Sequence, residues 1–210
     1  MTTSPLDVAG RIIARVVAAE VMRAGLSGAV MASPPGRVSD LLREWLSPLM
    51  RVRVPDAGAV ADVAGALAAA GAPGDVVETL AWRFVAEACG AAEQLLPVGS
   101  TNKAELLLDP RPLPARALPL GDVWASTLRS HAGTAPLPPV LTHALPAEVD
   151  AVERALDDYL ERGVAPDQAF GTLGALELPV RRALDAAQGR RSGLLVPKLT
   201  AWTVGCDLAR

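Results

Sequence analysis

A short polar segment between an apolar run and an apolar helix is the part of this chain best suited to chemistry. Residues 95–98 have the pattern of a buried strand, Gly99-Ser100-Thr101 can turn the chain, and residues 102–108 have the composition of a helix start. In α/β proteins, ligands bind where such strands end. The segment therefore has the expected geometry of a phosphate site.

The residues at this helix start supply groups that bind phosphate. Ser100 and Thr101 are typical N-cap residues, and the unpaired backbone N–H groups of a helix N-terminus attract anions. Lys103 would add a positive charge, and Glu105 could hold a hydrated Mg²⁺ on a nucleotide. The plainer interpretation also stays open: a capped helix with one lysine and one glutamate in its first turn.

Two more short strands and four helices are expected before this segment. Residues 28–32 form an apolar run between glycines and prolines, and residues 50–54 alternate apolar and polar side chains. Capping residues and helical spacing place the helices around these strands. The helices are expected to begin at Ser4-Pro5, after Ser39-Asp40, at Ala59 and at Asp75, and to end near Gly25, Leu46, Gly71 and Gly90.

The second half of the chain is predicted to be mainly helical. Residues 109–117 are irregular and rich in Pro and Arg, and residues 133–146 form a Pro-rich loop. Helices are expected over residues 122–129, 147–162 and 165–188. Strands separated by helices predict one α/β domain over residues 1–210, with a parallel, Rossmann-like sheet covered by helices on both faces and a helical C-terminal part.

Composition narrows the classes of function. The chain has 210 residues, 50% of them hydrophobic, and a net charge of −3 without a basic block, so a nucleic-acid surface is not expected. The apolar runs are interrupted by Asp or Arg before they reach the roughly 20 residues that span a membrane. The start of the chain does not resemble a signal peptide, so a cytoplasmic location is expected. Two cysteines and two histidines show no metal-ligand spacing.

The central segment resembles a motif of a known family. Gly99-Ser100-Thr101-Asn102-Lys103-Ala104-Glu105 is similar to the Gly-Thr-Gly-Asn-Lys-Ser-Glu motif of NAD synthetases. These are N-type ATP pyrophosphatases of the adenine nucleotide alpha-hydrolase-like superfamily that amidate deamido-NAD. Upstream, Trp82-Arg83-Phe84 matches the arginine-bearing helix that precedes the family's Gly-Thr strand.

Three later segments follow in the same order as in that family. Residues 119–129 resemble its Pro-Leu-Gly-Asp-Leu-Tyr-Lys-Thr-Gln-Val-Arg segment, residues 156–163 resemble its Asp-Asp-Tyr-Leu stretch, and Arg190-Arg191 falls near its C-terminal His-Lys-Arg. The resemblance therefore extends from about Asp75 to the C-terminus. It rests on the order and spacing of the motifs.

The resemblance implies an ATP- and Mg²⁺-dependent site. Lys103 and Glu105 would be catalytic, with Glu105 holding Mg²⁺ through ATP. The nucleotide-binding residues that it implies are Gly99, Ser100, Thr101, Asn102, Arg83, Asp122, Arg129, Arg190 and Arg191, together with Ser33, Arg37 and Ser39 after the first strand. Plain alternatives exist for several of these: a solvated helix face for Arg83, an N-cap for Asp122, and a helix C-terminus for the arginine pair.

The phosphate loop after the first strand departs from the family. Pro34 and Pro35 stand where the family's Ser-Gly-Gly-x-Asp-Ser loop has two glycines, and proline has no backbone N–H to donate. The phosphate cradle of the family therefore cannot form here. One possibility is that Arg37, Ser39 and the start of the next helix bind an anion in another arrangement. The plainer alternative is that the loop is only a turn between a strand and a helix.

Two other functional pieces of the family are missing. Ala125 replaces the family's phosphate-binding lysine, and residues 109–116 replace a longer substrate-binding segment. Arg111 and Arg116 are candidate substitutes for the lost positive charge. A solvated loop is the plainer place for both arginines.

Three hypotheses about function follow. The first is an ATP-dependent amide-forming ligase that uses ammonia to amidate deamido-NAD or another carboxylate. The second is a catalytically silent protein that keeps the fold as a binding or interaction module, as a homodimer or as the partner of an active homologue. An apolar stripe of Val76, Leu80, Phe84 and Ala88 could form such an interface. The third is a repurposed nucleotide-binding enzyme of specialised metabolism.

Overall fold

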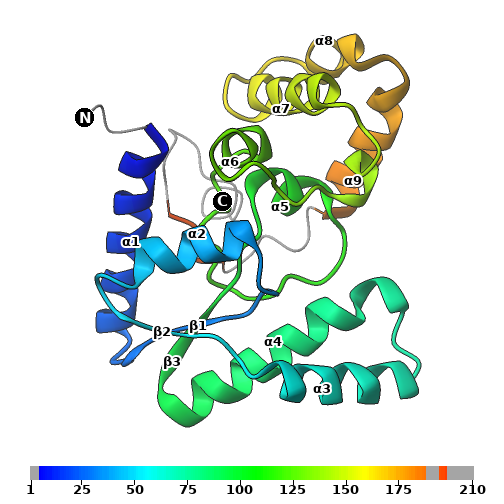
Figure 1. The fold of residues 1–210 in the computed structure, drawn as a ribbon. Helices are drawn as coiled ribbons and strands as arrows, with labels where there is room; N and C mark the ends of the chain where they lie inside the picture. The colour runs from blue at the N-terminus through cyan, green and yellow to red at the C-terminus, as the bar shows by residue number, and fades with distance from the viewer. Residues whose placement is uncertain (1–4, 188–193, 198–210) are drawn as a thin grey trace.

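The computed structural model of this protein describes residues 5–187 and 194–197. Three short strands and a series of helices make up these residues (Figure 1). In chain order the elements are α1 Pro5–Arg23, β1 Gly28–Met31, α2 Arg37–Leu46, β2 Arg51–Arg53, α3 Ala57–Ala69, α4 Gly74–Glu93, β3 Leu95–Val98, α5 Lys103–Leu108, α6 Ala125–Ala132, η1 Pro139–Leu141, α7 Pro146–Leu160, α8 Pro166–Phe170, η2 Gly171–Leu176 and α9 Glu177–Ala187.

The three strands form a small parallel sheet in the order β2-β1-β3. All three strands are at the predicted positions, so the prediction of an α/β protein with a parallel sheet is confirmed at this level. Single bridges extend the parallel pairing from Val98 to Ala117 and from Ala117 to Leu195. Gly28 lies very close to β2, since a Cβ at this position would lie 2.3 Å from the carbonyl oxygen of Arg51.

The alternation of side chains along β1 explains why helices cover both faces of the sheet. Ala29 and Met31 pack in a core with α1 and α2, whereas Val30 and Ala32 pack against Ala86 of α4. Successive side chains of a strand point to opposite faces, and β1 is apolar on both. Figure 1 shows α1 and α2 on one side of the strands and the α3–α4 hairpin on the other.

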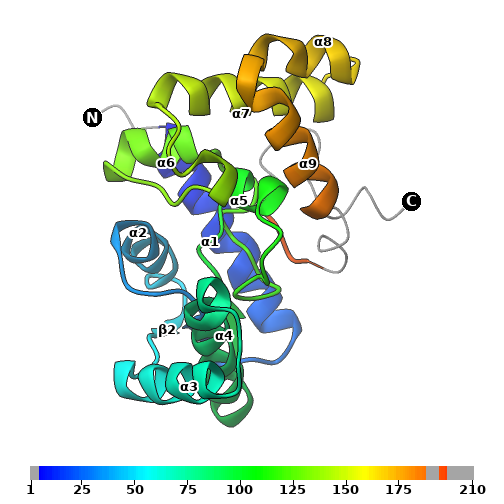
Figure 2. The ribbon, with the colours of Figure 1, turned by 90° about the vertical axis from the view of Figure 1, so that its right-hand side faces the viewer.

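The C-terminal helices form a second core beside the sheet. Leu106, Leu107 and Leu108 of α5 are completely buried in this core, and α5 packs against α9. Tyr159 and Phe170 add a tilted aromatic pair with ring centroids 5.3 Å apart. Figure 2 shows α7, α8 and α9 gathered on one side of α5, away from the strands. The predicted last helix over residues 165–188 is instead divided into α8, η2 and α9, where Gly174 adopts positive φ.

In the part of the chain that the structure describes, no helix is both long enough and apolar enough to cross a membrane.

Candidate functional site

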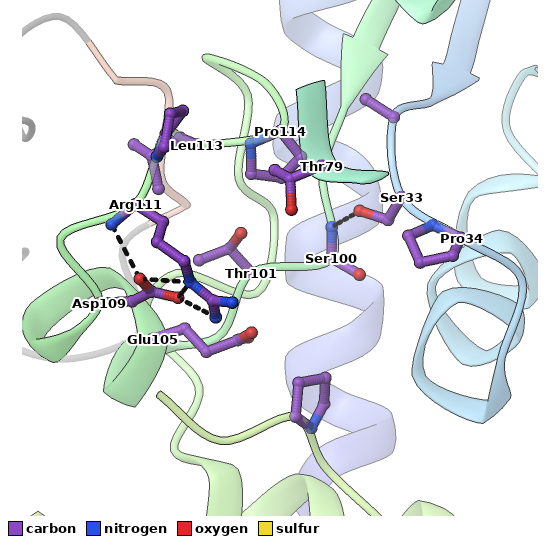
Figure 3. Close-up of a pocket in the computed structure, with 13 residues that line it drawn as sticks. Ser33, Pro34, Thr79, Ser100, Thr101, Glu105, Asp109, Arg111, Leu113 and Pro114 are labelled. Atoms are coloured by element: carbon purple, nitrogen blue, oxygen red, sulfur yellow. Dashed lines mark hydrogen bonds and ion pairs between the residues drawn. The ribbon is translucent and has the colours of Figure 1, made fainter. Parts of the chain in front are cut away.

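The chain connections create a crevice between β1 and β3. From β1 the chain passes through α2 to β2 on one side, and it returns through α3 and α4 to β3 on the other side. The loops that follow β1 and β3 therefore leave in different directions, and ligands bind at such switch points in open α/β sheets. A cavity of about 180 Å³ lies at this position (Figure 3).

Hydroxyl groups and three charged side chains line this cavity, which we call the first cavity. The charged groups are Glu105, Asp109 and Arg111. The other lining residues, which include four hydroxyl-bearing residues and four prolines, are Ala32, Ser33, Pro34, Thr79, Ser100, Thr101, Pro112, Leu113, Pro114 and Pro136. Ala32 to Pro34 follow β1, Ser100 and Thr101 follow β3, and Thr79 comes from α4.

Arg111 is fixed by a carboxylate of its own loop. Its Nε lies 3.0 Å from Asp109 Oδ1 and its Nη2 lies 2.6 Å from Asp109 Oδ2, and its backbone N–H also donates to Oδ1. Nη1 donates to the backbone oxygen of Asp75 at 3.3 Å, which ties this loop to the first turn of α4. The hydrogen bonds that Arg111 donates to the Asp109 carboxylate raise the pKa of Arg111, so the guanidinium remains charged.

Asn102 caps α5, and Glu105 completes the cap. The Asn102 side chain accepts a hydrogen bond from the backbone N–H of Glu105, and Glu105 Oε2 accepts from both the backbone N–H and Nδ2 of Asn102. This reciprocal pattern is a capping box. The expectation that Ser100 or Thr101 caps this helix is wrong, since Asn102 is the residue immediately before α5. Glu105 nevertheless lines the first cavity.

A hydrogen bond crosses the crevice between the two loops. The backbone N–H of Ser100 donates to Oγ of Ser33 at 2.9 Å, and both residues line the first cavity. Figure 3 shows this bond on the wall beside Pro34. The backbone N–H of Ser100, at the turn after β3, therefore binds the Ser33 side chain.

A second cavity of about 270 Å³ adjoins the first at the start of α2. Arg37, Ser39 and Pro34 line it, and Pro34, Ser100 and Pro136 line both cavities. Helix α2 begins at Arg37, earlier than predicted, so Ser39 lies inside the helix and its Oγ donates to the backbone oxygen of Pro34 at 2.7 Å.

Lys103 lines neither cavity, and its completely buried side chain lies in a cluster of charges. Its Nζ is 3.1 Å from Asp122 Oδ1, forms an ion pair with Glu161, and lies 4.6 Å from the centre of the Trp124 ring. This position differs from the expectation that Lys103 faces a phosphate, because two carboxylates compensate its charge. Asp122 is likewise part of this cluster and does not cap α6, which begins after Trp124.

A carboxylate lies at the start of α6, where Ala125 stands in place of the phosphate-binding lysine of the family that the sequence resembles. Glu153 of α7 accepts hydrogen bonds from the backbone N–H of Ser126, at 3.1 Å, and from its Oγ. Burial raises the pKa of Glu153, and the hydrogen bonds from Ser126 partly oppose this shift. A helix N-terminus attracts an anion, and here the chain supplies one itself.

The remaining predicted residues that the structure describes do not line either cavity. Arg83 pairs with Glu87 one turn later on α4, and Arg129 pairs with Asp150 of α7, both at 2.9 Å. Gly99 allows a close approach between loops, since a Cβ there would lie 2.7 Å from Pro114 Cγ. Arg190 and Arg191 lie outside the described residues.

Sequence reasoning missed several residues that shape these sites. Thr79 looked like one more polar residue of a helix, and Asp109 lay at the edge of an irregular loop. Glu153 and Glu161 are separated from Ser126 and Lys103 by 27 and 58 positions. The one available signal for the Asp109–Arg111 pair was the two-residue spacing of opposite charges.

Within residues 5–187 and 194–197, no group of three or more His, Cys, Asp or Glu side chains is arranged to hold a metal ion. No family model matches this chain, and no curated protein is similar to it in sequence.

Proposed function

We propose that this protein binds a small polar ligand at the switch point of its sheet and does not perform the adenylation step of the ATP-dependent ligases that its sequence resembles. The observation that carries this proposal is the burial of Lys103. Its charge is compensated by Asp122 and Glu161, so it is not directed to a phosphate.

The groups around the cavities support the same proposal. A triphosphate carries several negative charges, and the first cavity has two carboxylates and one guanidinium already paired with one of them. Ser100 directs its N–H to Ser33, and Pro34 and Pro35 have no N–H to donate. These residues do not fit Mg·ATP, because phosphoryl chemistry depends on cations and donors aimed at the phosphates.

An amide-forming ligase is the second candidate, and the position of Glu105 favours it. This carboxylate lines the first cavity, where it could contact a Mg²⁺ ion brought by a nucleotide. The proposal of a nucleotide or carboxylate substrate, of ATP with Mg²⁺ as cofactors, and of deamido-NAD amidation belongs to this candidate alone.

The cellular context is also part of the proposal. From the composition of the chain, we place the protein in the cytoplasm. From the apolar stripe of α4, we propose that it forms a homodimer or binds an active homologue. Nucleic acid and membranes are not proposed partners.

Ligand binding is tested by calorimetric titration of AMP, Mg·ATP, deamido-NAD and a panel of amino acids. Thr79→Arg should abolish binding, because a long side chain would fill the first cavity from α4. Thr142→Arg is the matched control, since Thr142 is exposed and does not line either cavity. Binding that Thr79→Arg leaves unchanged, or no binding by any compound, would contradict the proposed site.

A further inference from the structure

We propose that the ligand of the first cavity is an uncharged ring that carries several hydroxyl groups and has about the size of one monosaccharide. The inference rests on the proposed function, because it names the class of ligand that the same site binds. It follows from three properties of the cavity: a buried hydroxyl group without a partner, charges that are compensated within the chain, and apolar walls made largely of proline.

Thr101 provides the observation that points to a ligand. Its side chain lines the first cavity, and the residue is only 8% exposed. In the part of the chain that the structure describes, its hydroxyl group forms no hydrogen bond. A buried hydroxyl group without a hydrogen bond costs free energy, so such groups are normally paired. A ligand in the cavity would supply the missing partner.

Three more hydroxyl groups surround the same space. Those of Thr79 and Ser100 also bond to none of the described residues. Ser33 Oγ accepts from the backbone N–H of Ser100, and its own O–H donates to no described residue. Figure 3 shows Thr79 directed from α4 toward the turn that carries Thr101, with Ser33 on the wall that follows β1. Because each hydroxyl group can both donate and accept, the matching ligand carries hydroxyl groups on several sides.

The charged groups of the cavity are compensated within the chain. Arg111 forms a bidentate pair with Asp109. Glu105 accepts two hydrogen bonds from Asn102 in the capping box. The pKa of Arg111 is raised mainly by its hydrogen bonds to Asp109 and also by the charge of Glu105, so the three charges act on one another. An uncharged ligand leaves these pairs intact, whereas an ionic ligand would compete with them.

The apolar part of the lining comes largely from prolines. Pro34, Pro112, Pro114 and Pro136 line the cavity together with Leu113. Proline has no backbone N–H, so these walls offer C–H surface without hydrogen-bond donors. The C–H faces of a sugar-like ring can pack on them while its hydroxyl groups face the serines and threonines. The volume of about 180 Å³ lies below the roughly 300–1,000 Å³ of pockets for drug-sized molecules, and it suits a single ring.

The test adds uncharged rings to the calorimetric panel of the proposed function. The probes are D-ribose, D-glucose, myo-inositol and adenosine, because a free sugar, a cyclic polyol and the ribose of a nucleoside share this chemistry. Their hydroxyl-poor analogues are, in the same order, tetrahydrofurfuryl alcohol, tetrahydropyranylmethanol, cyclohexanol and dideoxyadenosine. At least one probe should bind the full chain about tenfold or more tightly than its analogue, since several hydrogen bonds are lost in the analogue. The phosphate ester of that probe should bind no more tightly than the probe.

Thr101→Val separates a binding role of this hydroxyl group from a structural role. Valine keeps the branched shape and removes the hydroxyl group, so binding of the preferred probe should weaken about threefold or more. In urea unfolding without ligand, the variant should be at least as stable as the wild type, because no hydrogen bond of the described fold is lost. Thr142→Val is the matched control for binding, since Thr142 is exposed and lines neither cavity.

The possible failures are distinct. If AMP or an amino acid binds in a Thr79-dependent way and no uncharged probe exceeds its hydroxyl-poor analogue, the inference is overturned and the proposed binding function stands. A phosphate ester that binds more tightly than its uncharged parent also overturns the inference. So does a Thr101→Val variant that keeps wild-type binding or loses stability.

Two further outcomes concern the source of the ligand and the proposed function itself. If adenosine exceeds dideoxyadenosine and the free rings do not bind, the hydroxyl-bearing ring belongs to a nucleoside and the inference is supported. Turnover of Mg·ATP, or no binding by any compound of the enlarged panel, would instead contradict the proposed function.

Discussion

Lys103 Nζ lies 3.1 Å from Asp122 Oδ1, and both side chains are completely buried. Glu161 contacts the same ammonium group from the C-terminal end of α7, so the cluster joins the start of α5 to two later segments of the chain. A buried lysine with two acidic partners organises the fold here, where the sequence predicts a phosphate ligand.

Removal of this lysine should destabilise the protein strongly. Lys103→Ala leaves Asp122 and Glu161 without their cation, and breaking a buried pair in this way costs about 3–5 kcal/mol. Urea unfolding measures the loss. Arg83→Ala is the control, because it removes a partly exposed pair with Glu87 and should cost less than about 1 kcal/mol. If Lys103→Ala and Arg83→Ala lost equally small amounts of unfolding free energy, the prediction for the buried cluster would be wrong.

The cap of α5 can be tested by two alanine substitutions. Asn102→Ala should lower the free energy of unfolding by about 1–2 kcal/mol, because it removes the side chain that accepts from the Glu105 N–H. Ser100→Ala should have a smaller effect, since the side chain of Ser100 does not take part in the capping box. Urea unfolding of both variants measures these two losses of free energy. A larger loss for Ser100→Ala than for Asn102→Ala would contradict the assignment of Asn102 as the cap of α5.

Glu153 should make stability depend on pH in a defined direction. Its pKa is raised in the folded protein, so between the ordinary and the raised pKa the folded state binds more protons than the unfolded state. The stability contributed by this group is therefore present below the ordinary carboxyl pKa and is lost as pH rises to the raised value. As pH rises from the ordinary carboxyl pKa to the raised pKa of Glu153, the free energy of unfolding of Glu153→Gln should increase relative to that of the wild type. Above the raised pKa this difference should stay constant. Urea unfolding of both proteins at several pH values measures this difference in free energy. A difference that does not change with pH over this interval would contradict the prediction.

The surface of α4 offers a test of the predicted homodimer. Phe84 is 45% exposed, which is unusual for a large apolar side chain. If α4 forms the interface, light scattering should give a dimer for the wild type and a monomer for Phe84→Glu. Leu178→Glu, on the exposed surface of α9, should remain a dimer. A wild-type monomer would end this prediction.

Local pattern was sufficient to predict the strands, and it was insufficient for the site. Leu95–Val98 is bounded by a helix end and a glycine, so its pattern alone locates it. Ser100, Thr101 and Asn102 can all cap a helix, and the choice among them depends on where the first helical turn begins. Lys103 has its partners 19 and 58 positions away, and no local pattern reveals that they meet. The same holds for Glu153 at the start of α6.

Pyrophosphate release by the folded protein tests the central claim most directly. Wild type, Glu105→Gln and the control Glu87→Gln are incubated with Mg·ATP, deamido-NAD and ammonium. We expect no release by wild type above that of Glu105→Gln, because the buried Lys103 and the proline loop leave the phosphates without their usual cations and donors. Release that requires deamido-NAD and is lost in Glu105→Gln alone would contradict the proposed binding function and establish an active ligase.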